Sequence, residues 1–287
     1  MSDSLLQSHR YGKRAIRLVH VARDGERHFL TDLDVDIALT GDLESTYLTG
    51  DNTGVLTTDA QKNTVYAFAK QYGVERIEDF ALLLARHFVR SQPTVSRSRV
   101  GISQHRWDRI TPQHSFVRQD GERRTVAVTH DADETWVVGG LSGLTLLNST
   151  GSEFRGFVKD EYTTLPETTD RIMATSVSAN WRYRETAGDF DTWHADIRRA
   201  LVTGFAETYS RSLQQTLYAM GEKVLNTCPA VVEVRLSLPN QHHIPVDLSH
   251  FGLDNPNEVF VATDQPHGLI EGALMREGVP AADPAWW

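Results

Sequence analysis

The stretch of the chain with the greatest potential for chemistry runs from Phe154 to Arg171. It contains two phenylalanines, a tyrosine, several hydroxyl side chains and, at its end, an arginine. An aromatic ring can stack on a flat ligand, and a guanidinium can bind two acceptor atoms of that ligand at once. The stretch therefore indicates a site for a flat, anionic, hydrogen-bonding ligand. An ordinary connecting loop is the structural alternative.

Strand-like segments flank this stretch on both sides. The run from Trp136 to Leu147 precedes it, and the glycines at 139, 140 and 143 permit a bend or a bulge. Apolar alternation resumes at Ile172 and continues to about Tyr183. We therefore expect the stretch to be a long connection held between two strands.

The first half of the chain has the pattern of a hairpin. Residues 11–22 alternate weakly, an Asp-Gly turn follows, and residues 29–39 alternate cleanly. The aspartates at 32, 34 and 36 share one face, which we expect to be solvated. The residues that share the opposite face are Phe29, Thr31, Leu33, Val35, Ile37 and Leu39.

Helices are predicted in both halves. Thr57-Thr58-Asp59 opens the first helix, with Asp59 as a plausible N-cap. A long helical zone in the second half runs from about Asp191 to Thr227. The apolar stripe of a further helix consists of Ile77, Phe80, Ala81, Leu84, Ala85 and Phe88. Other strands are expected at 95–108, 114–119, 123–130, Val231–Leu238 and Glu258–Met275.

A hairpin, a helix pair and strands are thus followed by the same plan again. This order of elements is typical of α+β domains, in which helices pack on one face of an antiparallel sheet. We predict an α+β chain of two halves, residues 1–134 and 135–287.

The composition of the chain excludes several classes of binding partner and of metal site. The 287 residues carry a net charge of −9, which argues against nucleic acid or an anionic membrane surface as the main partner. Cys228 is the single cysteine, so a disulfide framework and a multi-cysteine metal site are excluded. No apolar run approaches the ~20 residues that span a bilayer, and the N-terminus has no signal-peptide pattern. We expect a reducing cytoplasm.

Familiar cofactor and catalytic motifs are missing. The sequence has no Gly-rich dinucleotide fingerprint, no phosphate loop, no His-Glu-x-x-His and no Gly-x-Ser-x-Gly. His242 and His243 are adjacent, so on a strand they face opposite sides and make a poor metal pair. The sequence indicates neither an organic cofactor nor a metal.

Five separated fragments together resemble the urate oxidase (uricase) family, which has the tunnelling fold (T-fold). They are Tyr11-Gly-Lys13, Thr58-Asp59 with the Gln-Lys-Asn-Thr after it, Phe154–Arg171, Ser212-Leu-Gln214, and Ser237-Leu-Pro-Asn240-Gln-His242. They occur in the family's order, and the resemblance extends from about residue 9 to 276. It implies oxidation of urate by oxygen and water to 5-hydroxyisourate and hydrogen peroxide, without metal or organic cofactor.

The resemblance also assigns substrate-binding residues. Phe154 corresponds to the ring on which the purine stacks, an interaction worth ~1–3 kcal/mol. Arg171 and Gln214 correspond to the pair that clamps the pyrimidinedione side of the purine. The other implied binding positions, some acting through backbone amides, are Thr58, Asp59, Leu165, Leu213 and Asn240.

Catalysis falls, by the same resemblance, to Lys13, Thr58 and His242. Urate is already an anion at neutral pH, and its reaction with oxygen needs a further proton removed. Because a threonine hydroxyl is too weak a base alone, the resemblance implies that Lys13 accepts the proton through Thr58. His242 would orient Lys13 or help to pass the proton. Thr58 and Asn240 are implied to hold oxygen, and later the attacking water, above the ring.

The family assembles as a homotetramer in which sheets of neighbouring subunits join into closed barrels, which removes exposed sheet edges. The resemblance therefore implies sites at subunit interfaces. Two groups are expected to face each other there: Lys13, Thr58 and Asp59 from one subunit, and Phe154, Arg171, Gln214 and Asn240 from its neighbour.

Two features depart from other members of the family. Leu213 stands where many relatives carry a smaller branched residue, which changes affinity only if this side chain lines the site. The chain ends in Trp287 without a peroxisomal tail, as we expect of a bacterial cytoplasmic member. Two alternatives stay open: a zinc-dependent tunnelling-fold enzyme acting on pterins or other purines, and a non-catalytic protein that binds purines or pterins.

Overall fold

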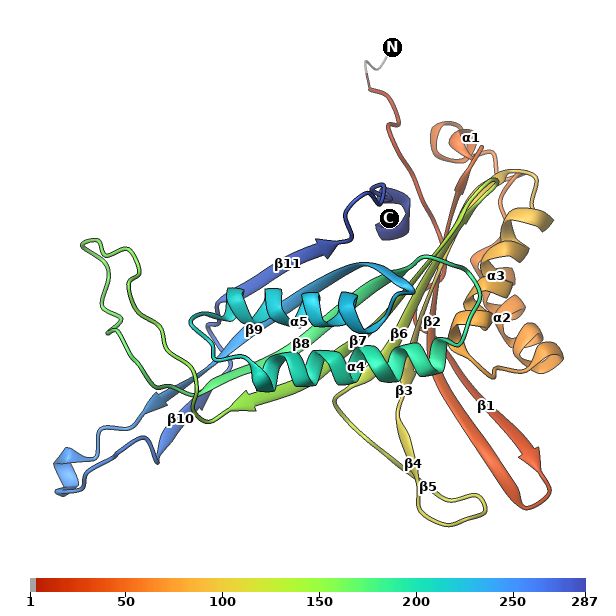
Figure 1. Ribbon diagram of the computed structural model, residues 1–287. Coiled ribbons are helices and arrows are strands. Elements are labelled where there is room, and N and C mark those ends of the chain that lie inside the picture. The colour runs from red at the N-terminus through yellow and green to blue at the C-terminus, as the bar shows by residue number, and fades with distance from the viewer. Residues whose placement is uncertain (1–3) are drawn as a thin grey trace. The chain divides into compact units, whose positions relative to one another are not determined.

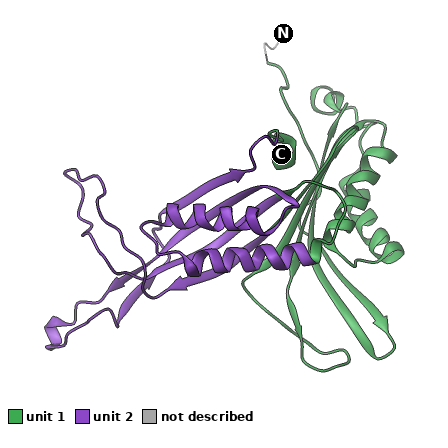
Figure 2. Cartoon of the chain, viewed as in Figure 1, with its two compact units in different colours: residues 1–140, 182–191, 280–287 green, residues 141–181, 192–279 purple. Residues whose placement is uncertain are grey.

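The computed structural model describes residues 4–287, and the chain divides into two compact units (Figure 2). Unit 1 contains Met1–Gly140, Arg182–Asp191 and Pro280–Trp287, and unit 2 contains Leu141–Trp181 and Thr192–Val279. Residues 1–3, at the start of the segment searched for a signal peptide, lie outside the described residues.

Unit 1 is an antiparallel sheet with helices on one face (Figure 1). Strands β1 (Ile16–Asp24), β2 (Arg27–Gly41), β3 (Val95–His105) and β6 (Arg123–Asp131) pair in that order, and β7 (Thr135–Asn148) follows β6. Helix α3 (Ile77–Ser91) packs against β3 and β6, and it also contacts α2 (Thr58–Tyr72). The shorter elements are α1 (Glu44–Leu48), the hairpin of β4 (Trp107–Arg109) and β5 (Phe116–Arg118), and the 3-10 helix η2 (Asp283–Trp286).

The alternation predicted for β2 is confirmed at its centre, where the buried residues are Leu33, Val35, Ile37 and Leu39. Phe29, near the start of the strand, is 47% exposed instead. The prediction of a solvated aspartate face is wrong at Asp32, which is 2% exposed. Its carboxylate accepts hydrogen bonds from Arg17 and, at 2.9 Å, from Trp107 Nε1. The β4 strand therefore covers this part of the face.

Helix α2 begins in the predicted segment but has a different N-cap. The Thr57 side-chain oxygen accepts a hydrogen bond from the Ala60 backbone nitrogen at 3.1 Å, which makes Thr57 the N-cap. The prediction of Asp59 is wrong because this residue already lies in the first turn. There its carboxylate accepts hydrogen bonds from Lys62 Nζ and Asn63 Nδ2.

The strand predicted from residue 11 begins later, at Ile16. Ala15 has a φ of +55°, which few residues other than glycine adopt, and its backbone nitrogen donates to Asp36 Oδ1 at 2.6 Å. The segment Tyr11–Lys13 before this break still hydrogen-bonds to the β2 backbone. Pairing along β2 therefore extends beyond β1.

Unit 2 contains the later strands of the same nine-stranded order, with helices on one face (Figure 1). Its strands follow the order β7, β8 (Met173–Tyr183), β9 (Val231–Pro245) and β10 (Phe260–Thr263), and β11 (Leu269–Met275) also pairs with β9. Helices α4 (Phe190–Glu207) and α5 (Leu213–Thr227) lie over one face, and α5 packs against β9 and β11. The 3-10 helix η1 (Ser249–Phe251) lies between β9 and β10 in the chain.

The predicted α+β class is confirmed by this order of helices and strands. The division near residue 134 stays a prediction. That residue lies in the turn between β6 and β7, where the Asp131 backbone nitrogen donates to the Glu134 carbonyl at 3.0 Å. Across residues 4–287, each helix is too short or too polar to cross a membrane.

A buried ion pair ties α3 to β6 in unit 1. The carboxylate of Glu78 is fully buried, and both of its oxygens accept hydrogen bonds from Arg124 Nη2 at 2.9 Å. Arg124 Nη1 also donates to the more exposed Asp191 at 2.6 Å. Burial raises the pKa of Glu78, while the charge of Arg124 opposes the rise. Arg124 thus offsets the free-energy cost of burying the Glu78 carboxylate.

Replacing this arginine, in Arg124→Met, should lower the free energy of unfolding by about 3–5 kcal/mol, because a buried charge is left unpaired. A carboxyl whose pKa is raised in the folded state stabilises the fold below its ordinary pKa, and that contribution is lost as the pH rises through the raised value. The deficit should therefore be larger at about pH 8 than at about pH 5. Urea unfolding at fixed protein concentration measures both.

The matched control is Arg106→Met, which breaks the exposed pair between Arg106 and Asp108. It should cost less than about 1 kcal/mol. Adding Glu78→Leu to Arg124→Met should recover part of the loss, because the unpaired charge is removed. Equal losses in the two single variants would contradict this account.

Candidate active site

Five predicted site residues line one cavity of about 420 Å³ in unit 2: Phe154, Leu165, Arg171, Asn240 and His242. The first three belong to the connection between β7 and β8, and the last two belong to β9. Segments that are far apart in the sequence therefore form one cavity wall.

Ser152 fixes Arg171 in this wall. The Arg171 backbone nitrogen donates to the Ser152 carbonyl at 3.0 Å, and Arg171 Nε donates to the Ser152 hydroxyl at 3.2 Å. The guanidinium carbon lies 5.0 Å from the centroid of the Phe154 ring. Because Nε is occupied, the two terminal nitrogens are the part of the guanidinium that can grip a ligand.

The Arg171 cation has no carboxylate partner among residues 4–287. Burial lowers the pKa of Arg171 from its ordinary value, and no neighbouring carboxylate raises it. A half-buried cation without a counterion is costly, and an anion that enters the cavity gains charge-assisted hydrogen bonds. This arrangement suits a flat anion with two adjacent acceptor atoms.

Backbone pairing and ring stacking fix the position of Phe154. Phe154 and Thr168 exchange two backbone hydrogen bonds, at 2.9 and 3.0 Å. The ring stacks on that of Phe157, with centroids 4.9 Å apart and 15° between the planes. Parallel stacking of this kind is also how a planar ligand binds an aromatic face.

A group of buried hydroxyls links this wall to helix α5. Ser152 and Ser210 are fully buried, and their segments pair through the hydrogen bond from the Glu153 backbone nitrogen to the Ser210 carbonyl at 2.8 Å. The Ser210 hydroxyl accepts a hydrogen bond from Thr216 Oγ1 at 2.8 Å. The segments carrying Phe154, Arg171 and the start of α5 are therefore held by one set of hydrogen bonds.

Leu213 and Gln214 do not line this cavity. Leu213 is 3% exposed and packs in the core. Gln214 is exposed in the first turn of α5. The predicted clamp of Gln214 with Arg171 stays a prediction.

Asn240 and His242 are presented by the far half of β9. The Asn240 backbone nitrogen donates to the Gly268 carbonyl at 2.8 Å, and His242 is paired with Thr263 on β10. His243 is paired with Ala262, and its Nδ1 lies 3.1 Å from the Gln241 carbonyl oxygen. Within residues 4–287, no group of three His, Cys, Asp or Glu side chains is arranged to hold a metal ion.

Lys13, Thr58 and Asp59 lie in unit 1. Lys13 follows Gly12, where an added Cβ would come within 1.8 Å of the Ile37 carbonyl oxygen. Only glycine therefore allows this segment to lie so close to β2. The hydrogen bond from Lys62 is the main cause that lowers the pKa of Asp59, and the charge of Lys13 adds to it. Lys13 thus lies within electrostatic range of the first turn of α2.

Sequence reasoning missed Ser152 and the anchoring of Asp170. The Asp170 carboxylate accepts hydrogen bonds from Thr150 Oγ1 at 2.7 Å and Asn257 Nδ2 at 3.4 Å. A role for Asp170 could have been predicted from the sequence, because this residue precedes Arg171 in the family motif. No spacing or composition signal distinguishes Ser152 from other serines.

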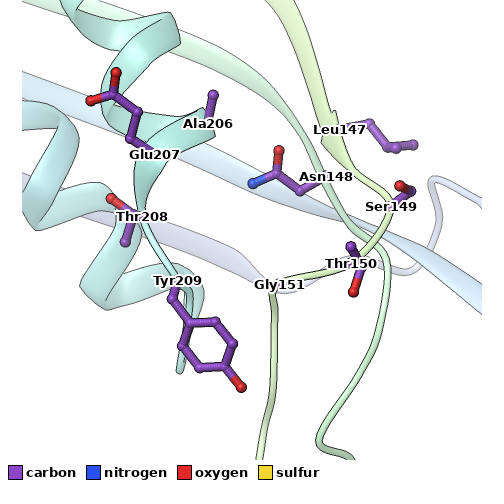
Figure 3. Close-up of a pocket in the computed structure, with 9 residues that line it drawn as sticks. All are labelled: Leu147, Asn148, Ser149, Thr150, Gly151, Ala206, Glu207, Thr208 and Tyr209. Carbon is purple, nitrogen blue, oxygen red and sulfur yellow. The ribbon is translucent and has the colours of Figure 1, made fainter.

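A second cavity in unit 2, of about 480 Å³, lies between the end of β7 and the end of α4 (Figure 3). Glu207 is the one charged residue that lines it, and the carboxyl-terminal end of a helix carries partial negative charge. This cavity is therefore unsuited to an anion, unlike the one beside Arg171.

The family model and the curated relatives that match this chain all belong to one family. The Uricase family model matches residues 9–129 and 137–271. The chain is 50% identical to the uricase of Arthrobacter globiformis, covering 98% of this chain and 93% of the relative. It is 38% identical to the uricase of Dictyostelium discoideum, covering 94% of this chain and 97% of the relative.

Solved structures agree with this family. The crystal structure of Arthrobacter globiformis uricase matches with a TM-score of 0.96 and 49% identity, covering 99% of both chains. A hyperthermostable mutant of Bacillus sp. TB-90 urate oxidase matches with a TM-score of 0.80, covering 94% of this chain and 100% of the other. Its identity of 23% shows a shared fold alone. With both the family model and full-length relatives matched, the chain belongs to the uricase family.

Proposed function

We propose that the chain oxidises urate with molecular oxygen and water to 5-hydroxyisourate and hydrogen peroxide, without metal or organic cofactor. The observation that carries this proposal is the Arg171 guanidinium, fixed by Ser152 beside the Phe154 ring and lacking a carboxylate partner in the described chain. Urate is a flat anion with adjacent acceptors. The uricase names of relatives at 50% and 38% identity support the same substrate.

The proposed chemistry uses a proton relay of Lys13, Thr58 and His242. Thr58 passes a urate proton to Lys13, and His242 orients the relay or passes the proton on. The electron-rich urate dianion then reduces oxygen to hydrogen peroxide, and water adds to the oxidised ring. Asn240 and Thr58 hold oxygen and then water in place. One urate, one oxygen and one water give one product and one peroxide.

The remaining proposed binding groups are Asp59, Leu165, Leu213 and Gln214, with Gln214 completing the clamp that Arg171 begins.

We propose that these residues act in a homotetramer, with each site completed by a neighbouring subunit. Strand β1 ends the strand order, and among residues 4–287 its one partner strand is β2, so its other edge can accept another strand. No nucleic acid or membrane is part of the proposal, and the cytoplasmic location stays a prediction.

The test of this function is loss of the urate ultraviolet band together with release of hydrogen peroxide. One peroxide for each urate consumed is the expected result. Tight urate or xanthine binding without peroxide would favour the non-catalytic binding protein instead. Activity towards pterins that requires added zinc would favour the other tunnelling-fold alternative.

Ser152→Ala should raise KM for urate about tenfold, because the guanidinium loses a hydrogen bond that fixes it. The value of kcat should change by less than about threefold, since the proton relay is untouched. Initial rates over a range of urate concentrations measure both. Ser149→Ala removes an exposed hydroxyl from the same connection and serves as the matched control. An unchanged KM in Ser152→Ala would contradict the role given to this serine.

A shared site predicts complementation between inactive variants. Lys13→Ala and Arg171→Ala proteins should each be nearly inactive, and hybrids formed by mixing them should recover part of the activity. Recovery arises because some sites in a hybrid combine the intact Lys13 of one subunit with the intact Arg171 of another. Native mass spectrometry establishes that hybrids form, and hybrids without activity would count against sites between subunits.

A further inference from the structure

The hydroxyl of Tyr11 joins the two segments of unit 1 that carry Lys13 and Thr58. It donates a hydrogen bond to the Leu56 carbonyl at 3.0 Å. Tyr11 lies two residues before Lys13, and Leu56 lies two residues before Thr58. One hydrogen bond therefore spans the gap between the two segments that the proposed relay must align.

Gln61 is a second donor to the same carbonyl. Its Nε2 lies 3.3 Å from the Leu56 oxygen, and the residue is fully buried in α2. The Oε1 atom of this side chain has no hydrogen-bond partner in the part of the chain that the structure describes. A buried acceptor without a partner lowers stability.

The backbone around Tyr11 restricts the segment on its other side. Tyr11 and Leu39 exchange backbone hydrogen bonds at 3.0 and 2.7 Å, and the Ile37 nitrogen donates to the Lys13 carbonyl at 2.8 Å. These bonds fix the segment to β2 but do not reach the start of α2. The Tyr11 hydroxyl makes that connection. A tyrosine hydroxyl is protonated at neutral pH and can donate, and burial raises the pKa of Tyr11 further.

We propose that Tyr11, supported by Gln61, is a positioning residue that sets the separation between the Lys13 amine and the Thr58 hydroxyl. This inference rests on the proposed function, because the relay is what needs the alignment. Tyr11 acts through Leu56 and does not touch the substrate. A small displacement between proton donor and acceptor slows the transfer strongly, whereas substrate binding by Phe154 and Arg171 is left intact.

Tyr11→Phe keeps the ring and removes the hydroxyl. The expected result is a fall in kcat of about tenfold or more with KM for urate within about twofold of the wild-type value. Tyr66→Phe is the matched control, because the Tyr66 hydroxyl also bonds a backbone carbonyl, that of Arg17, at 3.2 Å and also joins α2 to a neighbouring segment. It should leave kcat unchanged. The split between kcat and KM separates positioning from a general loss of folded protein.

Gln61→Met is the second variant and should lower kcat in the same way, so the test holds even if Tyr11→Phe does not fold. An unchanged kcat in a folded Tyr11→Phe protein, or equal losses in Tyr11→Phe and Tyr66→Phe, would overturn the inference and leave the proposed function standing. A wild-type protein that releases no peroxide from urate would overturn the proposed function, and this inference with it.

Discussion

The hydrogen bond from Arg171 Nε to the buried Ser152 hydroxyl is the interaction on which the candidate site depends. An arginine with a carboxylate partner would be neutralised before any ligand arrived. A serine instead fixes the direction of the guanidinium and leaves its charge and its two terminal nitrogens to a ligand. An anion that binds beside Arg171 would offset the cost of holding a half-buried cation.

Neighbouring segments of unit 2 keep Ser152 in place. Strands β7 and β8 hold the ends of the connection, and the pairing of Ser152 with Ser210 joins it to the start of α5. Asp170 anchors the other side of Arg171 through Thr150 and Asn257. In unit 1, the segment of Lys13 is also held in place by its neighbours. Gly12 lets it lie close to β2, and Tyr11 links it to the segment before α2.

Patterns of spacing predicted the elements well, because alternation and helical stripes report directly on burial, as β2 and α3 show. They failed where a tertiary contact decided the outcome. Asp32 is buried because Trp107 contacts it. Thr57 rather than Asp59 caps α2, because the helix begins two residues earlier than an Asp59 cap requires. The role of Ser152 could not be predicted from the sequence, because it depends on tertiary contacts with Arg171 and Ser210.

We propose that the side chains of this protein and the electron-rich substrate together suffice for oxidation. Oxygen uptake by chelator-treated protein supplied with urate tests it most directly. We expect uptake to persist after metals are removed, at one oxygen for each urate, and to be lost in Lys13→Ala. Uptake that vanishes on chelation and returns with an added metal would contradict it.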